Sequence, residues 1–417
     1  MMLGVSMNFE SLYKLFVMND STTFNRIYNE KFNSQSTIKF DIYINEQQSF
    51  FTYDKYIMAL VSNIRNIDNR INEIFSNLPP IAIDQYMRKS LIDEIEYTNE
   101  IEGVISTRKD INDLINEIEK KINTRNRFEG IVNKYVLLTE EQLDFKDSFD
   151  IRKLYDEMLY NEIRLEDEKN LPDGKIFRKE TVHIYKTGEK IIHNGIMPES
   201  KIIEYMNKAL YILNDQSIDI LIRVSLFHYY FGYIHPFYDG NGRINRFISS
   251  YILSKHFNEV IGFRLSMTIK ENLTQYLEAF SHTNDSRNKA DISTFVYEFL
   301  DLIYKSYQKT EIYALEKSQI LNKYEMILEK ITPIFETHKN KDAINQLLFI
   351  LIQCSIFGDF GLTKAKLCKI LEKGNTKVTE FLGVLKKHNL CTEIQSGKYH
   401  YYQANLEELD KLDKKVI

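Results

Sequence analysis

Nine residues near the middle of the chain, HPFYDGNGR at 235–243, place a histidine, a carboxylate and an arginine among glycines and a proline. An imidazole titrates near neutral pH and can accept a proton from a hydroxyl group. A carboxylate that faces a polyphosphate is normally bridged to it by Mg²⁺. Arg243 and Arg246 are three residues apart and can bind phosphate through paired hydrogen bonds. The pattern therefore predicts phosphoryl or nucleotidyl transfer, with His235 as base and Asp239 as metal ligand.

Two helices must position these side chains. The apolar stretch at 217–234 predicts a buried helix, and Pro236 disfavours helical geometry at His235, where that helix should end. Apolar residues at helical spacing after Gly242 predict a second helix that begins at Gly240-Asn241-Gly242. The free N–H groups and positive dipole end of such a helix attract anions, and glycines allow the closest approach. Phe237 is expected to anchor the loop by burying its ring.

Each feature also has a simpler explanation. A lone histidine before proline is usually structural or exposed, and a lone Gly-Asn-Gly is usually a turn. Arg243 and Arg246 could belong to a solvated helix face. The combination within one helix–loop–helix segment favours the functional interpretation.

The stretch HPFYDGNGRINR at 235–246 resembles the Fic motif, His-Pro-Phe-x-Asp/Glu-Gly-Asn-Gly-Arg-x-x-Arg, at every specified position. The resemblance covers about residues 80–305. It implies an all-helical core that transfers AMP from ATP, with Mg²⁺, to a tyrosine, serine or threonine hydroxyl of a protein. Gly242 differs from the Doc-like relatives, which have lysine there and transfer phosphate. Asn245 stands where the family often has a small residue and could crowd the helix start.

The resemblance also implies a role for each residue. His235 would activate the target hydroxyl, and Asp239 would hold Mg²⁺ on the α- and β-phosphates. Arg243 would contact the β-phosphate and Arg246 the γ-phosphate. The implied nucleotide site comprises Asp239, Gly240, Asn241, Gly242, Arg243, Ile244, Asn245 and Arg246, with His193, Asn194, Tyr276 and Asn284 around the adenosine.

The stretch TNEIEG at 98–103 continues an otherwise apolar helix face up to Glu102. A carboxylate on a buried face needs a partner, and the last turn of a helix disfavours negative charge. An arginine from elsewhere would solve both problems. By pattern alone, a helix that has emerged into solvent at Glu102 is the slightly better explanation.

Thr98 to Gly103 also resembles the inhibitory motif of Fic proteins, Ser/Thr-x-x-x-Glu-Gly/Asn. The resemblance implies the self-inhibited class with an N-terminal inhibitory helix, here residues 83–103. Glu102 would pair with Arg246 and take the place of the γ-phosphate. In some members of this class the same glutamate positions water that removes AMP from modified targets.

Residues 177–195 contain two β-rich runs on either side of Thr187-Gly188-Glu189, which predicts a hairpin. A purely structural hairpin explains the pattern equally well. The resemblance places the flap of Fic proteins here. An exposed hairpin edge can accept a segment of a target protein as an added strand.

The last part of the chain, 341–417, reads as three helices followed by two strands, which describes a winged helix. Such modules often bind DNA. The segment contains no arginine, and Glu380 interrupts the presumed face. DNA and a protein partner therefore stay open for this module, whose candidate phosphate contacts are Lys377, Lys386, Lys387 and Lys398.

The composition predicts a mainly α-helical chain, because its 417 residues include only 15 Gly and 6 Pro against 27 Tyr and 26 Phe. We expect an N-terminal α+β cap (1–78), a Fic domain (79–305), a helical linker (306–340) and the C-terminal module. Helices are expected at about 54–75, 83–102, 108–122, 126–138 and 149–165, and a strand at 37–45.

The net charge of −5 gives no global argument for nucleic acid or membranes. Cys354, Cys368 and Cys391 fit neither a disulfide framework nor a zinc site, which favours buried thiols in a reducing cytosol. No apolar run is long enough for a membrane span, and MMLGVSMNFESLYKLF at the start lacks the pattern of a signal peptide.

Together these features predict a cytoplasmic, self-inhibited protein adenylyltransferase that also modifies itself. A net AMP-removing enzyme is the second interpretation. A DNA-binding regulator with an ATP-sensing Fic core is the third, and the intact His235 argues against it. The oligomeric state is left open, a homodimer being one alternative.

Overall fold

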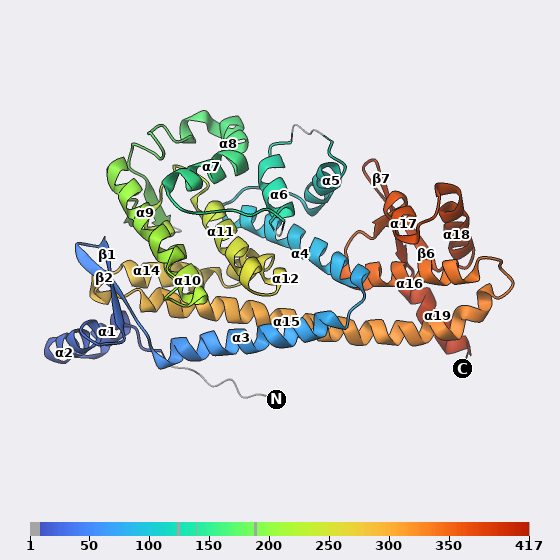
Figure 1. The fold of residues 1–417 in the computed structure, drawn as a ribbon, viewed down its shortest axis with the longest axis horizontal. Coiled ribbons are helices and arrows are strands. Elements are labelled where there is room, and N and C mark those ends of the chain that lie inside the picture. The colour runs from blue at the N-terminus through green and yellow to red at the C-terminus, as the bar shows by residue number, and fades with distance from the viewer. Residues whose placement is uncertain (1–8, 123–125, 139, 187–189, 417) are drawn as a thin grey trace. The chain divides into compact units, whose positions relative to one another are not determined.

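The structure is a computed structural model that describes residues 9–122, 126–138, 140–186 and 190–416. The chain forms two compact units (Figure 1). One unit combines Met1–Asp68 with Asp93–Gln308, and the other combines Asn69–Ile92 with Lys309–Ile417. Helices dominate both, as the composition predicted. Three long helices contribute residues to both units: α3 (Lys55–Ser76), α4 (Pro80–Ile101) and α15 (Ser293–Ile331).

The first unit is built around α10 (Ile220–Ile234) and α11 (Asn241–His256), in which nearly every side chain is buried. Helix α9 (Glu199–Asn214) packs along α10 (Figure 1). The remaining helices of this unit are α1 (Leu12–Met18), α2 (Ser21–Phe32), α5 (Arg108–Glu119), α6 (Glu129–Val136), α7 (Ser148–Met158), α8 (Tyr160–Asp167), α12 (Glu259–Gly262), α13 (Leu265–Glu271) and α14 (Leu273–Asn284).

The predicted strand at 37–45 is confirmed as β1 (Thr37–Ile44), which pairs antiparallel with β2 (Gln47–Thr52). Ser49 on β2 is hydrogen-bonded to Tyr230 on α10 at 2.8 Å. The N-terminal hairpin therefore supports the helix that leads into the motif loop.

The prediction of a single helix at 149–165 is wrong. The structure has two helices there, α7 and α8, which meet at Leu159. The backbone of Leu159 leaves helical geometry there, with φ −126° and ψ −18°. Its side chain is buried beneath Gly240, and a Cβ atom on Gly240 would lie 2.5 Å from Leu159 Cδ1. Packing against the motif loop thus overrides the helical pattern and redirects α8.

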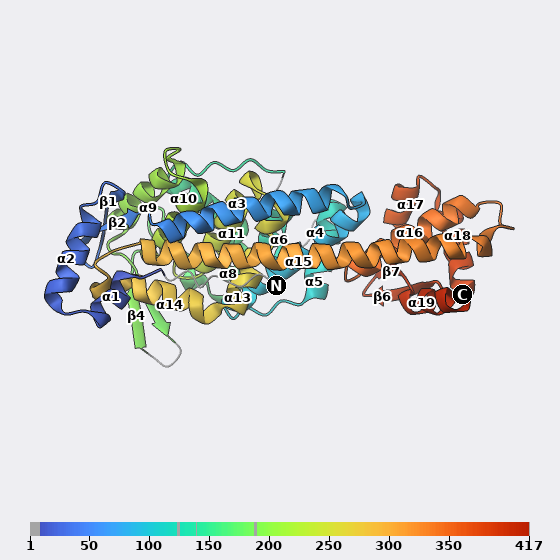
Figure 2. The same ribbon diagram turned by 90° about the horizontal axis from the view of Figure 1, so that it is seen from below.

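A second hairpin, β3 (His183–Lys186) and β4 (Lys190–Asn194), lies where the flap was expected. Figure 2 shows it projecting from the helices of its unit. The predicted turn residues Thr187-Gly188-Glu189 lie outside the described residues.

The second unit contains α16 (Lys341–Phe357), α17 (Lys364–Leu371), α18 (Asn375–Lys387) and α19 (Leu406–Val416). Its sheet has the order β5–β7–β6, from Leu362–Thr363, Tyr399–Ala404 and Cys391–Ser396. All three cysteines are free thiols, and burial raises the pKa of Cys391 to about 12. Among the described residues, no helix is long and apolar enough to cross a membrane.

Candidate active site

The motif loop begins at His235, where α10 ends as predicted. His235 has a left-handed backbone, φ 52° and ψ 65°, and its N–H donates to the Phe231 carbonyl at 2.9 Å. The imidazole Nδ1 lies 3.4 Å from the Gly232 carbonyl. A left-handed histidine is uncommon, so its neighbours must hold this conformation.

The loop is held in shape from beneath by Phe237 and Asn241. The Phe237 ring is fully buried, as predicted, and stacks on Tyr155 with 4.0 Å between ring centroids. Asn241 Oδ1 accepts the Phe237 N–H at 2.9 Å, and Asn241 Nδ2 donates to the Phe237 carbonyl at 2.8 Å. The Asn241 side chain therefore fixes the loop, and its backbone N–H remains for an anion.

Helix α11 begins after Gly240, whose φ of +81° favours glycine. Among the described residues no side chain caps this helix, so its first N–H groups are available to an anion. A Cβ atom on Gly242 would lie 2.0 Å from Glu102 Oε1. With any larger residue at position 242, either the Glu102 side chain or the main chain at 242 would therefore have to move.

Arg246 is buried and is bound by Thr98 on α4 and by Glu102, just after the end of that helix. Its Nη2 donates to Glu102 Oε1 at 2.8 Å and to the Thr98 carbonyl at 2.9 Å, while its Nε donates to Thr98 Oγ1 at 2.9 Å. This is the contact that the sequence resemblance implied. Burial acts to raise the pKa of Glu102, but the charge and hydrogen bond of Arg246 outweigh it and lower that pKa below its usual value. Glu102 is thus an ionised carboxylate at neutral pH.

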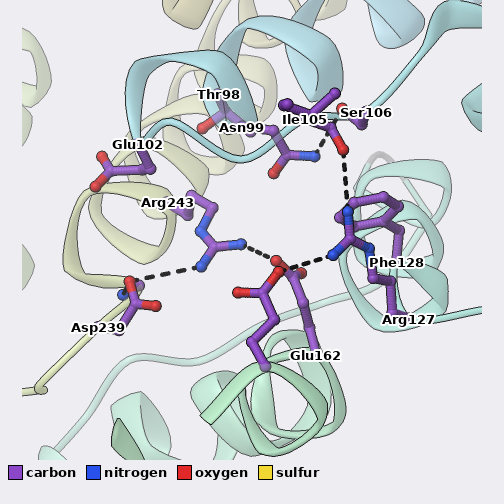
Figure 3. Close-up of polar contacts among 12 residues, drawn as sticks. Thr98, Asn99, Glu102, Ile105, Ser106, Arg127, Phe128, Glu162, Asp239 and Arg243 are labelled. Carbon is purple, nitrogen blue, oxygen red and sulfur yellow. Dashed lines mark hydrogen bonds and ion pairs between the residues drawn. The ribbon is translucent and has the colours of Figure 1, made fainter.

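Helix α4 ends at Ile101, and Glu102 lies in the turn that follows at Gly103, the predicted stop, which has φ +76°. Asn99 Nδ2 donates to Ser106 Oγ at 3.1 Å, and Arg127 Nη2 donates to the Ile105 carbonyl at 3.1 Å (Figure 3). The segment after Glu102 is therefore fastened at two points while the Glu102 side chain keeps 27% of its surface exposed.

Arg243 is paired with Glu162 on α8. Nη1 of Arg243 lies 2.5 Å from Glu162 Oε1, and neither side chain is exposed. Figure 3 shows the guanidinium between Glu162 and Asp239, whose Oδ1 lies 3.7 Å from Arg243 Nη2. Nε and Nη2 of Arg243 are buried without a hydrogen-bond acceptor among the described residues. The pair with Glu162 therefore leaves two N–H groups of Arg243 without a hydrogen bond within the described part of the chain.

Sequence reasoning missed Glu162. Nothing in the local sequence distinguishes it from Glu157 or Glu166, because the direction of α8 depends on the break at Leu159. Burial raises the pKa of Glu162, and the nearby Arg243 charge opposes this shift.

A second missed carboxylate, Glu94, lies on α4 one turn before Thr98. It is fully buried and accepts hydrogen bonds from Ser266 N at 2.7 Å, Ser266 Oγ at 2.6 Å and Ser250 Oγ at 3.2 Å. Burial raises the pKa of Glu94 to about 7, although these bonds and the charge of Arg246 act in the opposite direction. Glu94 therefore joins α4 to α11 and α13.

The first N–H groups of α11, Arg243 and Arg246 together form what we call the cradle. The side chains of Ile244 and Asn245 do not face it. Ile244 is fully buried, and Asn245 Nδ2 donates to the His228 carbonyl at 2.8 Å. The crowding anticipated at Asn245 does not occur, because its side chain packs against α10.

The four residues proposed around the adenosine have different surroundings. Tyr276 is buried, is hydrogen-bonded to His228 at 2.8 Å and lies beside Arg246. Asn284 accepts a hydrogen bond from Tyr229 at 2.7 Å, and Asn194 contacts His183 at 2.7 Å. The backbone of His193 pairs with Ile184, while its side chain lies outside the described part of the structure. Only Tyr276 of these four contacts a cradle residue among the interactions described.

Asp239 fits a magnesium ligand that is shared with phosphates. Its side chain is 36% exposed, and its Oδ1 accepts the Gly240 N–H. Among the described residues, no cluster of three or more His, Cys, Asp or Glu could hold a metal by itself. Mg²⁺ is commonly bound by one or two carboxylates together with substrate phosphates, which matches this arrangement.

A separate cavity of about 500 Å³ lies among the loop at 140–145 and the ends of α9, α10 and α11. Its lining includes Phe145, Arg223 and Tyr251 but no residue between His235 and Arg246. The chemistry of the motif loop therefore has no part in it.

Comparisons with known proteins find one family model and several solved structures that are similar to this chain. Residues 146–253 match the family model described as Fic/DOC family. A comparison with curated proteins finds no match. A solved structure of a Fic family protein from Desulfovibrio desulfuricans G20 is 20% identical with a TM-score of 0.50, and the alignment covers 85% of this chain and 97% of that one.

Two further solved structures are more distant. Fic-1 from C. elegans is 17% identical with a TM-score of 0.40, covering 62% of this chain and 73% of that one. A Fic domain containing signaling protein from Bacteroides thetaiotaomicron VPI-5482 is 17% identical with a TM-score of 0.41, covering 63% and 97%. The motif and the family model together show that residues 146–253 of this chain are similar to the Fic/DOC family. That family generally transfers a nucleoside monophosphate to proteins.

Proposed function

We propose that this protein transfers AMP from ATP to a tyrosine, serine or threonine hydroxyl of a protein and inhibits itself through Glu102. The observation that carries the proposal is the contact between Glu102 and Arg246 beside an uncapped helix terminus. A phosphate cradle whose second arginine is already occupied by a carboxylate suits a regulated enzyme.

In the transfer step, His235 takes the proton of the target hydroxyl, and the oxygen of that hydroxyl attacks the α-phosphorus of ATP. The bond between the α-phosphorus and the bridging oxygen breaks, so AMP is esterified to the target and pyrophosphate leaves. The first N–H groups of α11 and the two arginines stabilise the charge on the phosphates. Mg²⁺ at Asp239 would neutralise further phosphate charge.

Self-inhibition follows from competition for Arg246. The carboxylate of Glu102 occupies the donor that a γ-phosphate needs, so ATP binds without its α-phosphate in line with the hydroxyl. Glu162 has the opposite effect in this proposal. It binds Nη1 of Arg243 and leaves Nε and Nη2 for the β-phosphate.

Removal of AMP is a second candidate activity. It is supported by the partly exposed and ionised carboxylate of Glu102, which can orient a water molecule. Release of AMP from a pre-modified target by the parent protein, and its loss in Glu102→Gly, would support this activity. Equal release by both proteins would exclude Glu102 from it.

We also propose partners for two surfaces. The hairpin at 177–195 would accept a target segment as an added strand, which aligns its hydroxyl with His235. Helices α16, α17 and α18, together with the β5–β7–β6 sheet, support a winged-helix assignment for the second unit. On α18, Lys377 is paired with Glu380, and Lys386 with Glu393, which weakens the case for DNA. Anisotropy of labelled duplex DNA titrated with the full chain would decide this point.

The experiment that tests the transfer uses His235→Ala in a Glu102→Gly background with labelled ATP. We expect self-labelling and target labelling to fall about 10²–10⁴-fold, because general-base assistance is lost. ATP binding should persist, since His235 serves the hydroxyl. The control is His256→Ala at the end of α11, whose Nδ1 contacts the Ile252 carbonyl. Undiminished labelling by His235→Ala would refute the assignment.

A further inference from the structure

A buried arginine outside the motif joins the hairpin to the motif loop. Arg178 has no exposed surface and lies just before β3. Its Nε donates to the His235 carbonyl at 2.8 Å, its Nη1 to the Glu180 carbonyl at 2.6 Å, and its Nη2 to the Ile196 carbonyl at 3.0 Å. One side chain thus holds the end of α10 and the chain on both sides of the hairpin.

Main-chain hydrogen bonds connect the same segments. The N–H of Arg178 donates to the Pro236 carbonyl at 3.3 Å, and the N–H of Ile196 donates to the Ile234 carbonyl at 3.1 Å. The base of the hairpin is closed by the Gly195 N–H, which donates to the Val182 carbonyl at 3.0 Å. The guanidinium lies where these connections meet.

The main chain at Gly195 passes close to the guanidinium of Arg178. A Cβ atom on Gly195 would lie 2.3 Å from Arg178 Nη2 and 2.8 Å from Val182 Cγ2. Real Cβ atoms do not approach so closely, so a side chain at position 195 would force the guanidinium of Arg178 or the side chain of Val182 to move.

The charge of Arg178 makes this arrangement costly for stability alone. All its acceptors shown in the structure are main-chain carbonyls and the thioether of Met197, at 3.3 Å, and none is a carboxylate. Burial lowers the pKa of Arg178 to about 10, which still leaves it cationic at neutral pH. A buried cation without a countercharge normally destabilises a protein.

The benefit lies in the conformation of His235. A left-handed non-glycine residue persists only when its surroundings hold it, and Arg178 Nε holds the His235 carbonyl. We propose that Arg178 is a positioning residue that fixes the backbone of His235 and the base of the hairpin together. This inference rests on the proposed function. Arg178 would thus hold both the hairpin, whose edge would receive the target segment, and His235, which would deprotonate the target hydroxyl.

The first test is Arg178→Lys in the Glu102→Gly background, with Arg223→Lys as the matched control. Lysine keeps the charge but cannot direct donors to three separated carbonyls. Arg223 is also buried, at 5% exposure, and donates to a main-chain carbonyl, that of Leu213 at 3.0 Å. We expect kcat to fall about 10²-fold in Arg178→Lys, as for a displaced catalytic group. The Kd for ATP should not change, because Arg178 contacts none of the phosphate-binding residues.

The second test measures position without activity. Hydrogen exchange should become faster at the amides of His235 and Ile196 in Arg178→Lys, and not in Arg223→Lys. Normal kcat and normal exchange in a folded Arg178→Lys would overturn the inference, as would an equal loss in the control. If Arg178→Lys does not fold, Arg178→Gln, which keeps a planar donor, provides the same comparison.

The two tests separate this inference from the proposed function. If the parent does not transfer AMP but the exchange of His235 and Ile196 still depends on Arg178, the proposed function fails while the structural coupling stands. If the parent transfers AMP and Arg178→Lys does so equally well, only the role of Arg178 fails.

Discussion

Arg243 and Arg246 lie three residues apart on one helix, and each is paired with a glutamate, Glu162 on α8 and Glu102 just after the end of α4, yet the two pairs differ in kind. Glu162 is completely buried against Arg243, whereas the side chain of Glu102 keeps 27% of its surface exposed against Arg246. Burial raises the pKa of Glu162, while the pKa of Glu102 is lowered because Arg246 outweighs its burial.

The donors used by the two arginines differ in the same sense. Arg246 donates from Nε to Thr98 and from Nη2 to Glu102, so a phosphate must displace a protein group to reach these two nitrogen atoms. Arg243 donates from Nη1 to Glu162, whereas its Nε and Nη2 have no hydrogen-bond acceptor among the described residues. Under the proposed function, the comparison teaches that a partly exposed carboxylate just after a helix end would be exchanged for phosphate, whereas a fully buried one inside a helix would act as a permanent support.

The largest difference between the pairs should appear when each glutamate is replaced. Glu102→Gly should raise self-labelling with ATP, since Arg246 becomes available to the γ-phosphate. A coupling of about 1.4–3 kcal/mol corresponds to roughly 10–150-fold. Labelled ATP and autoradiography measure the change.

The control for this prediction is Glu100→Gly. Glu100 lies two residues before Glu102 in the chain, and its exposed carboxylate pairs with Lys270. The double variant Glu102→Gly with Arg246→Ala should behave like Arg246→Ala alone. Labelling that is unchanged or lowered in Glu102→Gly would mean that TNEIEG is only a helix end.

Glu162→Gln should change activity in the opposite direction and by less. In the Glu102→Gly background we expect the Kd for ATP to rise about tenfold, because Arg243 loses a charge-assisted hydrogen bond. Isothermal titration with ATP measures this. Glu166→Gln on the same helix, whose partner Arg127 is half exposed, should have little effect. Higher labelling in Glu162→Gln would show instead that both glutamates act as brakes.

The smallest effect concerns Glu94, the buried carboxylate behind Arg246. Its pKa in the folded protein is about 7, above the ordinary value of 4.5, so the native state binds the proton more tightly. Its contribution to stability is complete below the ordinary pKa and is lost as the pH rises through the folded pKa. The free energy of unfolding should therefore decline by about 1–3 kcal/mol between about pH 5 and pH 8.

Glu94→Gln should flatten that part of the pH profile, since a neutral amide does not titrate. Urea unfolding at several pH values compares the two proteins. An identical slope in Glu94→Gln would assign the pH dependence to other groups.

Much of the site could be predicted from residue order because its groups are adjacent in the chain. The end of α10 at His235, the glycine-rich start of α11 and the burial of Phe237 depend on local rules about proline, glycine and helix ends. The helix end at Gly103 depends on the same rules. The contact between Glu102 and Arg246 crosses 144 positions of sequence, and only the resemblance to a known motif implied it.

Other features required the tertiary structure, since packing decides between locally equivalent residues. Arg178, Glu162 and Glu94 are ordinary charged residues in helical or loop sequence, and their burial depends on which elements meet there. The break at Leu159 shows this most clearly, because it arises from contact with Gly240 and then directs Glu162 to Arg243. The sequence by itself determined which residues carry the groups that the proposed chemistry needs. The tertiary structure decided which carboxylates and carbonyls hold them, because those partners are defined by proximity in space and leave no local pattern in the chain.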